Sequence, residues 1–151
     1  MAHYEWWTKR ELYRRLCKTF GVYPTIDVAA NAENTLCSKF ITKEQDALKC
    51  AWYDGTPNCS IFCNPPNSEL MAFINKAFAE WQANNISILM LVPTGVIARK
   101  YFKPIWEIFR EDANKILVAP LFTRPIFLDH GVEPKFGARE DYMVIHFRPR
   151  A

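Results

Sequence analysis

The sequence contains little glycine and no long apolar run. Of its 151 residues only 5 are glycine, while 50% are hydrophobic and 15% are aromatic. This composition excludes a disordered chain, and a packed chain of this length is expected to form a single domain over residues 1–151. No stretch reaches the roughly 18 apolar residues of a membrane-spanning helix, and the first residues lack the apolar core of a signal peptide. We therefore expect a cytoplasmic protein with no membrane partner.

The cysteines lack the pattern of a disulfide framework or of a metal site. Their number is odd and no signal peptide points to an oxidising compartment, which favours free thiols at Cys17, Cys37, Cys50, Cys59 and Cys63. Cys59 and Cys63 could supply half of a metal site. No CxxC pair and no HxxxH pattern accompanies them, so we expect no metal ion.

Hydrophobic periodicity predicts an alternation of strands and helices. Strands are expected at 24–30, 60–63, 86–92, 115–119, 124–128 and 141–147, and helices at 9–20, 69–83 and 97–111. The run at 86–92 is continuously apolar, which is typical of a strand buried on both faces of a parallel sheet. We therefore expect a three-layer α/β domain with a mainly parallel central sheet.

Two of the predicted helices carry capping signals. Thr8 and Glu11 have the spacing of a capping box, so Thr8 is expected to cap the helix at 9–20, which ends at Gly21. Ser68 is the expected N-cap of the helix at 69–83. Both caps are inferred from local sequence alone.

Polar and small residues occur at the ends of three of the predicted strands or directly after them. These residues are 27–31 (Asp-Val-Ala-Ala-Asn), 64–66 (Asn-Pro-Pro) and 93–94 (Pro-Thr). In open α/β sheets ligands bind at the carboxyl ends of the strands, so these residues are candidates for a site. Asp and Asn also open loops and Pro also stops strands, so each has a structural explanation. That explanation is weakest for Asn-Pro-Pro after a buried run.

The Asn-Pro-Pro stretch favours chemistry on an exocyclic amine. Two prolines fix φ twice and remove two N–H donors, which can hold the side-chain oxygen of Asn64 and the carbonyl of Pro65 facing one point. An amine such as adenine N6 carries two N–H donors, and its lone pair is delocalised into the ring. Two fixed acceptors would orient this amine and stabilise the positive charge that develops on its nitrogen. The pattern therefore predicts direct methyl transfer from S-adenosylmethionine, without a covalent enzyme intermediate.

With these motifs the chain resembles the phage-type, Dam-like family of DNA N6-adenine methyltransferases over most of its length. The similar segments are "EWWT" at 5–8, "IDVAANAENTLCSKFITKEQDAL" at 26–48, "IFCNPPNS" at 61–68, "MLVPT" at 90–94 and "TRPIFL" at 123–128. Lys9 stands where the family often has Pro. Only Asn-Pro-Pro is specific by itself, so the order and spacing of the five segments carry the match. The resemblance implies a Rossmann-like methyltransferase fold, S-adenosylmethionine as cofactor, and the host cell's cytoplasm as location if the protein is phage-encoded.

The resemblance also implies roles for individual residues. The catalytic motif would be Asn64, Pro65, Pro66 and Asn67, and the cofactor would be bound by Trp6, Thr8, Asp27, Ala29, Ala30, Asn34, Asp46 and Cys63. Asp27 and the two alanines would lie by the methionine part of the cofactor, and Asp46 would accept a hydrogen bond from its adenine or ribose. Trp6 and Trp7 would cover the cofactor, unless they are ordinary core residues. A Gly-x-Gly signature is absent, so the cofactor assignment rests mainly on the resemblance.

Asn67 departs from the family, which normally has an aromatic residue there to stack on a base flipped out of the duplex. Three interpretations are open. Another ring could substitute, from Phe62, Phe73 or Phe136. The substrate could be single-stranded, where flipping needs less energy, or the chain could bind the cofactor and transfer poorly. We favour a working enzyme.

A basic segment is the expected contact with DNA. The net charge of +3 fits a polyanionic partner without singling one out. The chain lacks room for a separate target-recognition domain, so only segment 94–140 is free to bind duplex or single-stranded DNA, through Arg99, Lys100, Arg124, Lys135 and Arg139. Phosphate contacts of this kind position DNA but do not read its sequence, which predicts low specificity, or specificity supplied by a homodimer.

Two other functions remain open. A protein glutamine methyltransferase uses the same Asn-Pro-Pro chemistry on a side-chain amide, but it would carry Tyr at position 67 and a glycine-rich cofactor loop, and the chain has neither. A non-catalytic subunit that binds cofactor or nucleic acid beside an active methyltransferase is the second alternative, and Asn67 favours it.

Overall fold

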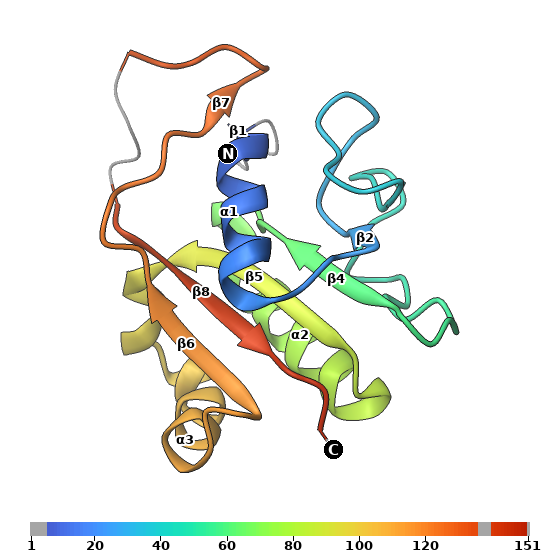
Figure 1. Ribbon diagram of the computed structural model, residues 1–151, viewed down its shortest axis with the longest axis vertical. Coiled ribbons are helices and arrows are strands. Elements are labelled where there is room, and N and C mark those ends of the chain that lie inside the picture. Colours follow the sequence, from blue (N-terminus) through green and yellow to red (C-terminus); the bar gives the residue numbers. More distant parts are fainter. Residues whose placement is uncertain (1–5, 136–139, 151) are drawn as a thin grey trace.

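A six-stranded sheet forms the centre of the protein (Figure 1). The computed structural model describes residues 6–135 and 140–150. The strand order is β3-β2-β4-β5-β8-β6, with β2 (Ile26–Asp27), β3 (Lys39–Phe40), β4 (Ser60–Cys63), β5 (Ser87–Pro93), β6 (Ile116–Pro120) and β8 (Tyr142–Phe147). β3, β2, β4 and β5 are parallel neighbours, whereas β8 lies antiparallel between β5 and β6. All strands of this sheet except β8 therefore share one direction, and the mainly parallel sheet expected from the sequence is confirmed.

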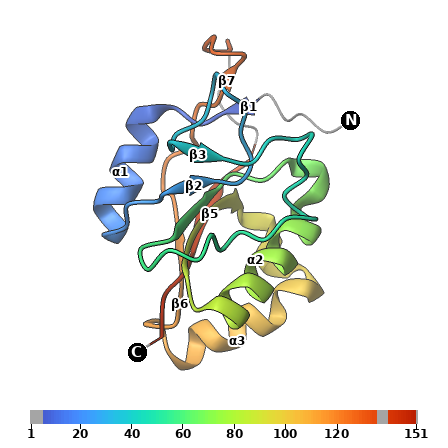
Figure 2. The same ribbon diagram turned by 90° about the vertical axis from the view of Figure 1, so that its right-hand side faces the viewer.

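Helices cover both faces of the sheet. α1 (Arg10–Phe20) packs on one face, and α2 (Leu70–Asn84) and α3 (Lys103–Glu111) pack on the other (Figure 2). Alternate residues of β5 pack against the helices on opposite faces of the sheet. Leu89 and Leu91 join the core beneath α1, whereas Ile88 and Met90 join the core beneath α2 and α3. This alternation explains why the strand is apolar throughout, and the expected three layers are confirmed.

α1 begins without the cap expected from the sequence. Its N-cap is Lys9, which makes no side-chain hydrogen bond to the first turn. The predicted capping box is therefore wrong, because the hydroxyl of Thr8 contacts a residue of another element, described below. The predicted end at Gly21 is confirmed: φ is 66° there, and the N–H donates to the Cys17 carbonyl. Glycine adopts this left-handed conformation at little cost.

Two helical boundaries differ from the expected ones. A 3-10 turn, η1 (Asn67–Glu69), precedes α2 and contains Ser68, so Ser68 is not the N-cap of that helix. The single helix expected at 97–111 is divided into η2 (Thr94–Ala98), η3 (Lys100–Phe102) and α3. Pro104 lies in the first turn of α3, where proline is tolerated, and it could not occupy the interior of one longer helix without breaking it.

The expected strands at 24–30 and 124–128 are mostly irregular. Only β2 remains of the first. Of the second, Leu128 begins β7 (Leu128–Asp129), which pairs antiparallel with β1 (Trp6–Trp7) in a separate two-stranded sheet. Pro125 has no N–H to donate, which keeps the residues before β7 out of a ladder.

The described part of the chain shows free thiols at all five cysteines. Within the same ranges there is no group of three or more His, Cys, Asp or Glu side chains that could hold a metal ion. No helix of residues 6–135 or 140–150 is long and apolar enough to cross a membrane.

His146, on β8, makes the stability of the fold sensitive to acid. Its side chain is 3% exposed, and burial, with a smaller contribution from Arg148, lowers its pKa from 6.5 to about 4. The neutral ring is therefore the folded form, and its contribution is present above pH 6.5 and is lost as the pH falls toward 4. We expect wild type to lose about 2 kcal/mol more stability than His146→Leu between pH 7 and pH 5.

Denaturant unfolding at the two pH values measures this difference. Ser87→Ala is the matched control, because it removes the hydroxyl 3.3 Å from the Nε2 of His146 and leaves the ring in place. It should keep the acid sensitivity of wild type. Equal pH dependence of wild type and His146→Leu would contradict the prediction.

Candidate active site

The polar strand ends meet at one edge of the sheet. β2, β4 and β5 are parallel and end at the same edge, with Asp27 opposite Phe62 in register. The Val28 N–H donates to the Phe62 carbonyl at 3.1 Å, so the chain leaving β2 runs beside Asn64. The sequence correctly predicted that these segments lie together.

Asp27 braces the loop that follows β2. Its carboxylate is 4% exposed and accepts hydrogen bonds from the Ala29 N–H at 3.3 Å and the Leu36 N–H at 3.2 Å. Burial raises its pKa from 3.8 to about 6, against the opposing effect of these two hydrogen bonds. Asp27 therefore stabilises the conformation of the loop. Its side chain does not line the cavity that the loop helps to form.

Asn31 and Asn34 close the same loop on itself. The Asn31 N–H donates to the Oδ1 of Asn34 at 2.7 Å, and the Asn34 N–H donates back to the Oδ1 of Asn31 at 2.9 Å. The side-chain oxygen of Asn34, expected to bind cofactor, is engaged in this turn. Asn34 is not among the residues that line the cavity, whereas Asn31 is.

A cavity of about 250 Å³ opens beside this loop. Its walls are the residues after β2 (28–31), the segment after β3 (41–44 and 46–47), the last residue of η1 (Glu69) and Phe73 near the start of α2. Three of the residues predicted to bind cofactor line it: Ala29, Ala30 and Asp46. Trp6, Thr8 and Cys63, like Asp27 and Asn34, do not.

Asp46 has a special conformation in the cavity wall. Its φ is 59°, in the left-handed region that few residues other than glycine adopt, and its Oδ1 accepts a hydrogen bond from the Leu48 N–H at 3.0 Å. Asp and Asn tolerate this region better than most residues. The turn thus fixes one carboxylate oxygen and holds the side chain at the cavity.

The segment between β3 and Asp46 was not predicted from the sequence to form part of the site. Thr42, Lys43 and Glu44 line the cavity, and so do Glu69 and Phe73. β3 consists only of Lys39–Phe40, which is too short to give an alternating pattern. Had β3 been recognised, the rule that ligands bind at carboxyl strand ends would have pointed to Thr42, Lys43 and Glu44, which follow it.

Asn64 is oriented by a residue far away in the chain. Its Nδ2 donates a hydrogen bond to the Oγ1 of Thr8 at 3.0 Å. Pro65 and Pro66 are buried behind it, and the Pro66 carbonyl accepts from the Glu69 N–H at 3.0 Å, which closes η1. No described residue donates a hydrogen bond to the Oδ1 of Asn64. Among the described residues, the corner therefore has one acceptor, the Oδ1 of Asn64, without a donor.

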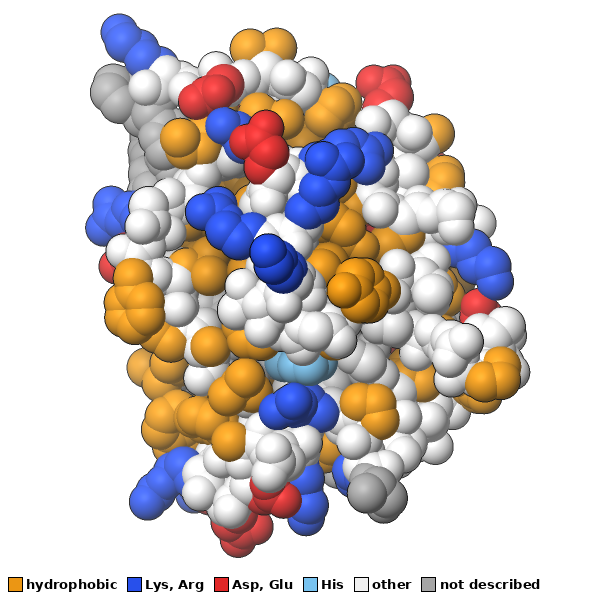
Figure 3. All heavy atoms as spheres, in the orientation of Figure 1, with side chains coloured by type: hydrophobic (Ala, Val, Ile, Leu, Met, Phe, Trp, Pro, Cys, Tyr) orange, Lys and Arg blue, Asp and Glu red, His pale blue; other side chains and the backbone are white. Residues whose placement is uncertain are grey.

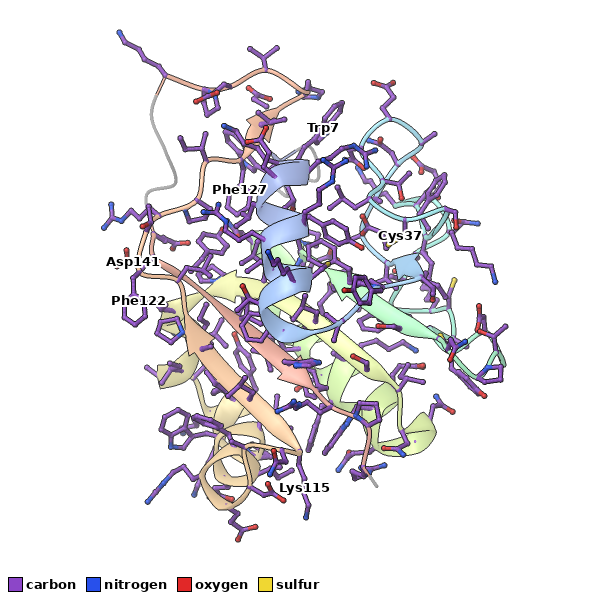
Figure 4. All side chains as sticks on the ribbon, viewed as in Figure 1. Trp7, Cys37, Lys115, Phe122, Phe127 and Asp141 are labelled. Carbon is purple, nitrogen blue, oxygen red and sulfur yellow. The ribbon has the colours of Figure 1, made fainter. Side chains whose placement is uncertain are left out.

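Cys63 and Trp7 are packed against other residues of the fold and do not line the cavity. Cys63 is 0% exposed, and burial raises the pKa of its thiol well above the ordinary value. The ring of Trp7 lies against Gly131, where φ is +84° and an added Cβ would come within 2.9 Å of Cζ3. Trp7 lies beside the first turn of α1 (Figure 4), so of the two expectations for it, packing fits better than covering the cofactor.

Asn67 is exposed and contacts one ring. The Tyr142 hydroxyl donates a hydrogen bond to its Oδ1 at 3.4 Å, and Tyr142 itself packs edge-on against Phe127 with 4.9 Å between ring centroids. Phe62, offered as a substitute ring, is 1% exposed and packs edge-on against Tyr13, so it is not free to stack on a base. No sequence pattern pointed to Tyr142.

Phe73, the second candidate ring, also gives no stacking surface at residue 67. Phe73 is 4% exposed, lines the cavity and packs against Trp52. Phe136 lies outside the described residues. The exposed Phe122, at 97%, projects from the loop after β6 beside Asp141 (Figure 4). No expectation from the sequence concerned this ring.

The predicted DNA-binding residues that the structure describes lie in two segments of the chain. Arg99, between η2 and η3, and Lys100, the first residue of η3, are exposed. Arg124 is also exposed, and it forms an ion pair with Asp141 at 3.0 Å. Lys135 is exposed, and Arg139 lies outside the described residues. The Thr94 N–H donates to the Asp141 carbonyl at 2.9 Å, which joins the two loops at the edge of the sheet.

A further basic surface lies on α1. Lys and Arg side chains gather over this helix (Figure 3), and its exposed basic residues are Arg10, Arg14, Arg15 and Lys18. Their spacing follows the outward face of the helix. This face lies outside segment 94–140, where DNA contacts were expected from the sequence.

A cavity at the carboxyl edge of an α/β sheet, beside a polar corner, is the arrangement of α/β domains that bind organic ligands. Residues 2–119 match the family model described as DNA N-6-adenine-methyltransferase (Dam), so the chain belongs to this family. It is also 38% identical over 88 residues to a DNA N-6-adenine-methyltransferase of Escherichia phage T1. That match covers 58% of this chain and 35% of the relative, so the chain spans about a third of the relative's length. The family resemblance noted in the sequence is confirmed.

Proposed function

We propose that the protein is an S-adenosylmethionine-dependent DNA N6-adenine methyltransferase with a Rossmann-like methyltransferase fold. The observation that carries the proposal is the corner at Asn64, whose Oδ1 accepts no hydrogen bond from the described residues and stands at the sheet edge that also holds the cavity. Membership of the Dam family supports the choice of adenine in DNA over other amines.

The lining of the cavity fits this cofactor. Three acidic residues, Glu44, Asp46 and Glu69, face it with one basic residue, Lys43. A cationic sulfonium is therefore favoured over an anionic nucleotide. Phe73 adds an apolar ring for a base, and the acidic oxygens can accept hydrogen bonds from ribose hydroxyls.

The small residues of the wall suit a close approach. Ala29 and Ala30 follow β2 and present little more than backbone to the cavity. Asp27, behind them, holds the Ala29 N–H by its carboxylate and so fixes the course of the loop. S-adenosylmethionine, when bound here, supplies an electrophilic methyl group.

The residues of the corner orient the amine. The Oδ1 of Asn64 and the carbonyl of Pro65 accept its two N–H groups, which turns the nitrogen lone pair away from the corner. Thr8 holds the Asn64 amide before the substrate arrives, and the two prolines restrict the backbone at the Pro65 carbonyl, so both acceptors can stabilise the positive charge that develops on nitrogen. The nitrogen loses its proton readily after transfer, and no strong base is needed.

Methyl transfer to defined substrates tests the function. Protein with methyl-labelled S-adenosylmethionine is incubated with duplex and single-stranded oligonucleotides, with matched oligonucleotides that carry purine in place of adenine, and with a protein pool. We expect label only in the adenine-containing DNA, recovered as N6-methyladenine. Label in protein alone would favour the glutamine methyltransferase, and no transfer at all would favour a non-catalytic subunit.

Asn67→Tyr tests how the flipped base is held. Residue 67 is exposed, so a tyrosine ring has room there, and stacking on a base contributes about 1–3 kcal/mol. We expect tighter binding and faster turnover on duplex DNA, and a smaller gain on single strands, where flipping needs less energy.

The control is Asn67→Leu, which removes the hydrogen bond from Tyr142 in the same way but adds no ring. Binding and single-turnover rates are measured for both variants on matched oligonucleotides. If Tyr and Leu behave alike on both substrates, residue 67 does not face the base.

A further inference from the structure

The hydrogen bond between Thr8 and Asn64 joins two parts of the chain that lie 56 residues apart. Thr8 stands between β1 and α1, whereas Asn64 directly follows β4. Both side chains are partly buried, and the bond is 3.0 Å long. Thr8 was expected to bind the cofactor, but it does not line the cavity. Its hydroxyl contacts the amide of the catalytic motif instead.

Thr8 makes this contact in place of a helix cap. Its spacing to Glu11 is that of a capping box, yet α1 begins at a Lys9 N-cap with no side-chain hydrogen bond. A capping side chain stabilises the start of a helix. The helix lacks that stabilisation. Departures of this kind from local sequence preference are found at functional sites.

Thr8 is held in place independently of Asn64. The preceding residues pair with β7, Trp6 with Asp129 and Trp7 with Leu128. The following residue, Lys9, forms an ion pair with Glu133 at 3.2 Å. The hydroxyl is therefore a fixed point against which the amide of Asn64 can be aligned.

The orientation of the amide decides whether it can bind an amine. A carboxamide has an oxygen that accepts and a nitrogen that donates, and the two ends are nearly equal in size. Rotation by a half turn would place the Nδ2 donors of Asn64 against the N–H donors of the target. With Nδ2 bonded to Thr8, the Oδ1 is the end left for the substrate.

We propose that Thr8 is a positioning residue for methyl transfer, which holds the Asn64 amide with its oxygen toward the target amine. The inference rests on the proposed function. It concerns the chemical step and not the cofactor, because Thr8 lies outside the cavity wall.

The pair Thr8→Val and Thr8→Ser tests the role of the hydroxyl. Valine has the shape of threonine without the hydroxyl, and serine keeps the hydroxyl without the methyl group. Loss of one preorganised contact is expected to lower kcat about tenfold in Thr8→Val, while Thr8→Ser stays within about twofold of wild type. Cofactor Kd and thermal midpoint should stay near wild-type values in both. Thr19→Val, an exposed change late in α1, is the matched control and should leave kcat unchanged.

A second readout does not depend on turnover. The side-chain amide protons of Asn64, identified by their loss in Asn64→Asp, are followed by NMR. In wild type and Thr8→Ser one of them should exchange slowly with solvent, and in Thr8→Val both should exchange fast.

The outcomes separate the two claims. If the wild type is active, and Thr8→Val has the same kcat and the same amide exchange as wild type, the role of Thr8 is overturned and the proposed function stands. A Thr8→Val variant that loses only cofactor affinity also overturns it, because the residue would then belong to the cofactor site. A wild type that binds cofactor but methylates no DNA overturns the proposed function, and this inference with it.

Discussion

Asn64→Ala is expected to slow methyl transfer to adenine by about 10²–10³-fold, the loss typical of removing one preorganised acceptor or donor at a developing charge. The variant should still fold, because Asn64 is only partly buried and the prolines behind it remain. Cofactor affinity should also remain, since Asn64 does not line the cavity. Single-turnover rates with saturating cofactor measure the chemical step directly.

Asn114→Ala is the matched control for the loss of an amide. Asn114 is exposed in the turn before β6, at the opposite edge of the sheet from Asn64. Its replacement should leave the rate of transfer at the wild-type value. A rate for Asn64→Ala within a few-fold of wild type would refute the mechanism proposed for the corner.

Asp46→Asn is expected to weaken binding of S-adenosylmethionine by about ten- to a hundredfold. The change removes a charged acceptor, and hydrogen bonds to charged groups contribute about 1.5–3 kcal/mol. Asparagine tolerates the φ of 59°, and its Oδ1 can still accept from the Leu48 N–H. The turn should therefore persist, and the loss of affinity should report on the missing charge alone.

Calorimetric titration with the cofactor measures this loss. Asp112→Asn is the matched control, because the Oδ1 of Asp112 also accepts a backbone N–H, from Asn114 at 2.9 Å, in a turn far from the cavity. It should bind the cofactor as wild type does. Unchanged affinity in Asp46→Asn would mean that the cavity is not the cofactor site.

The parts of the site that follow strand patterns could be predicted from the sequence. β4 and β5 are apolar runs, their parallel pairing brings their ends to one edge, and the residues after β2 are small. The direction of β8 could not be predicted, because an apolar strand buried on both faces gives no sign of its orientation. β3 was missed for the same kind of reason, since two residues form no period.

The positions of the other site residues depend on tertiary contacts that the sequence does not reveal. Local sequence favoured Thr8 as a cap, but a partner 56 residues away takes its hydroxyl. Asp27 was expected to face the cofactor. The N–H groups of Ala29 and Leu36 turn its carboxylate into the protein instead. Spacing along the chain does not reveal which of several polar groups a side chain will meet.

The place of β8 bears on how the protein is assembled. This strand fills the gap between β5 and β6, although it follows both in the chain. Until residues 142–147 emerge during synthesis, β5 and β6 each expose an unpaired apolar edge, and such edges template aggregation. Pairing between segments so distant in sequence also slows folding. A truncation before Tyr142 would therefore leave every proposed catalytic residue intact and still yield an insoluble chain.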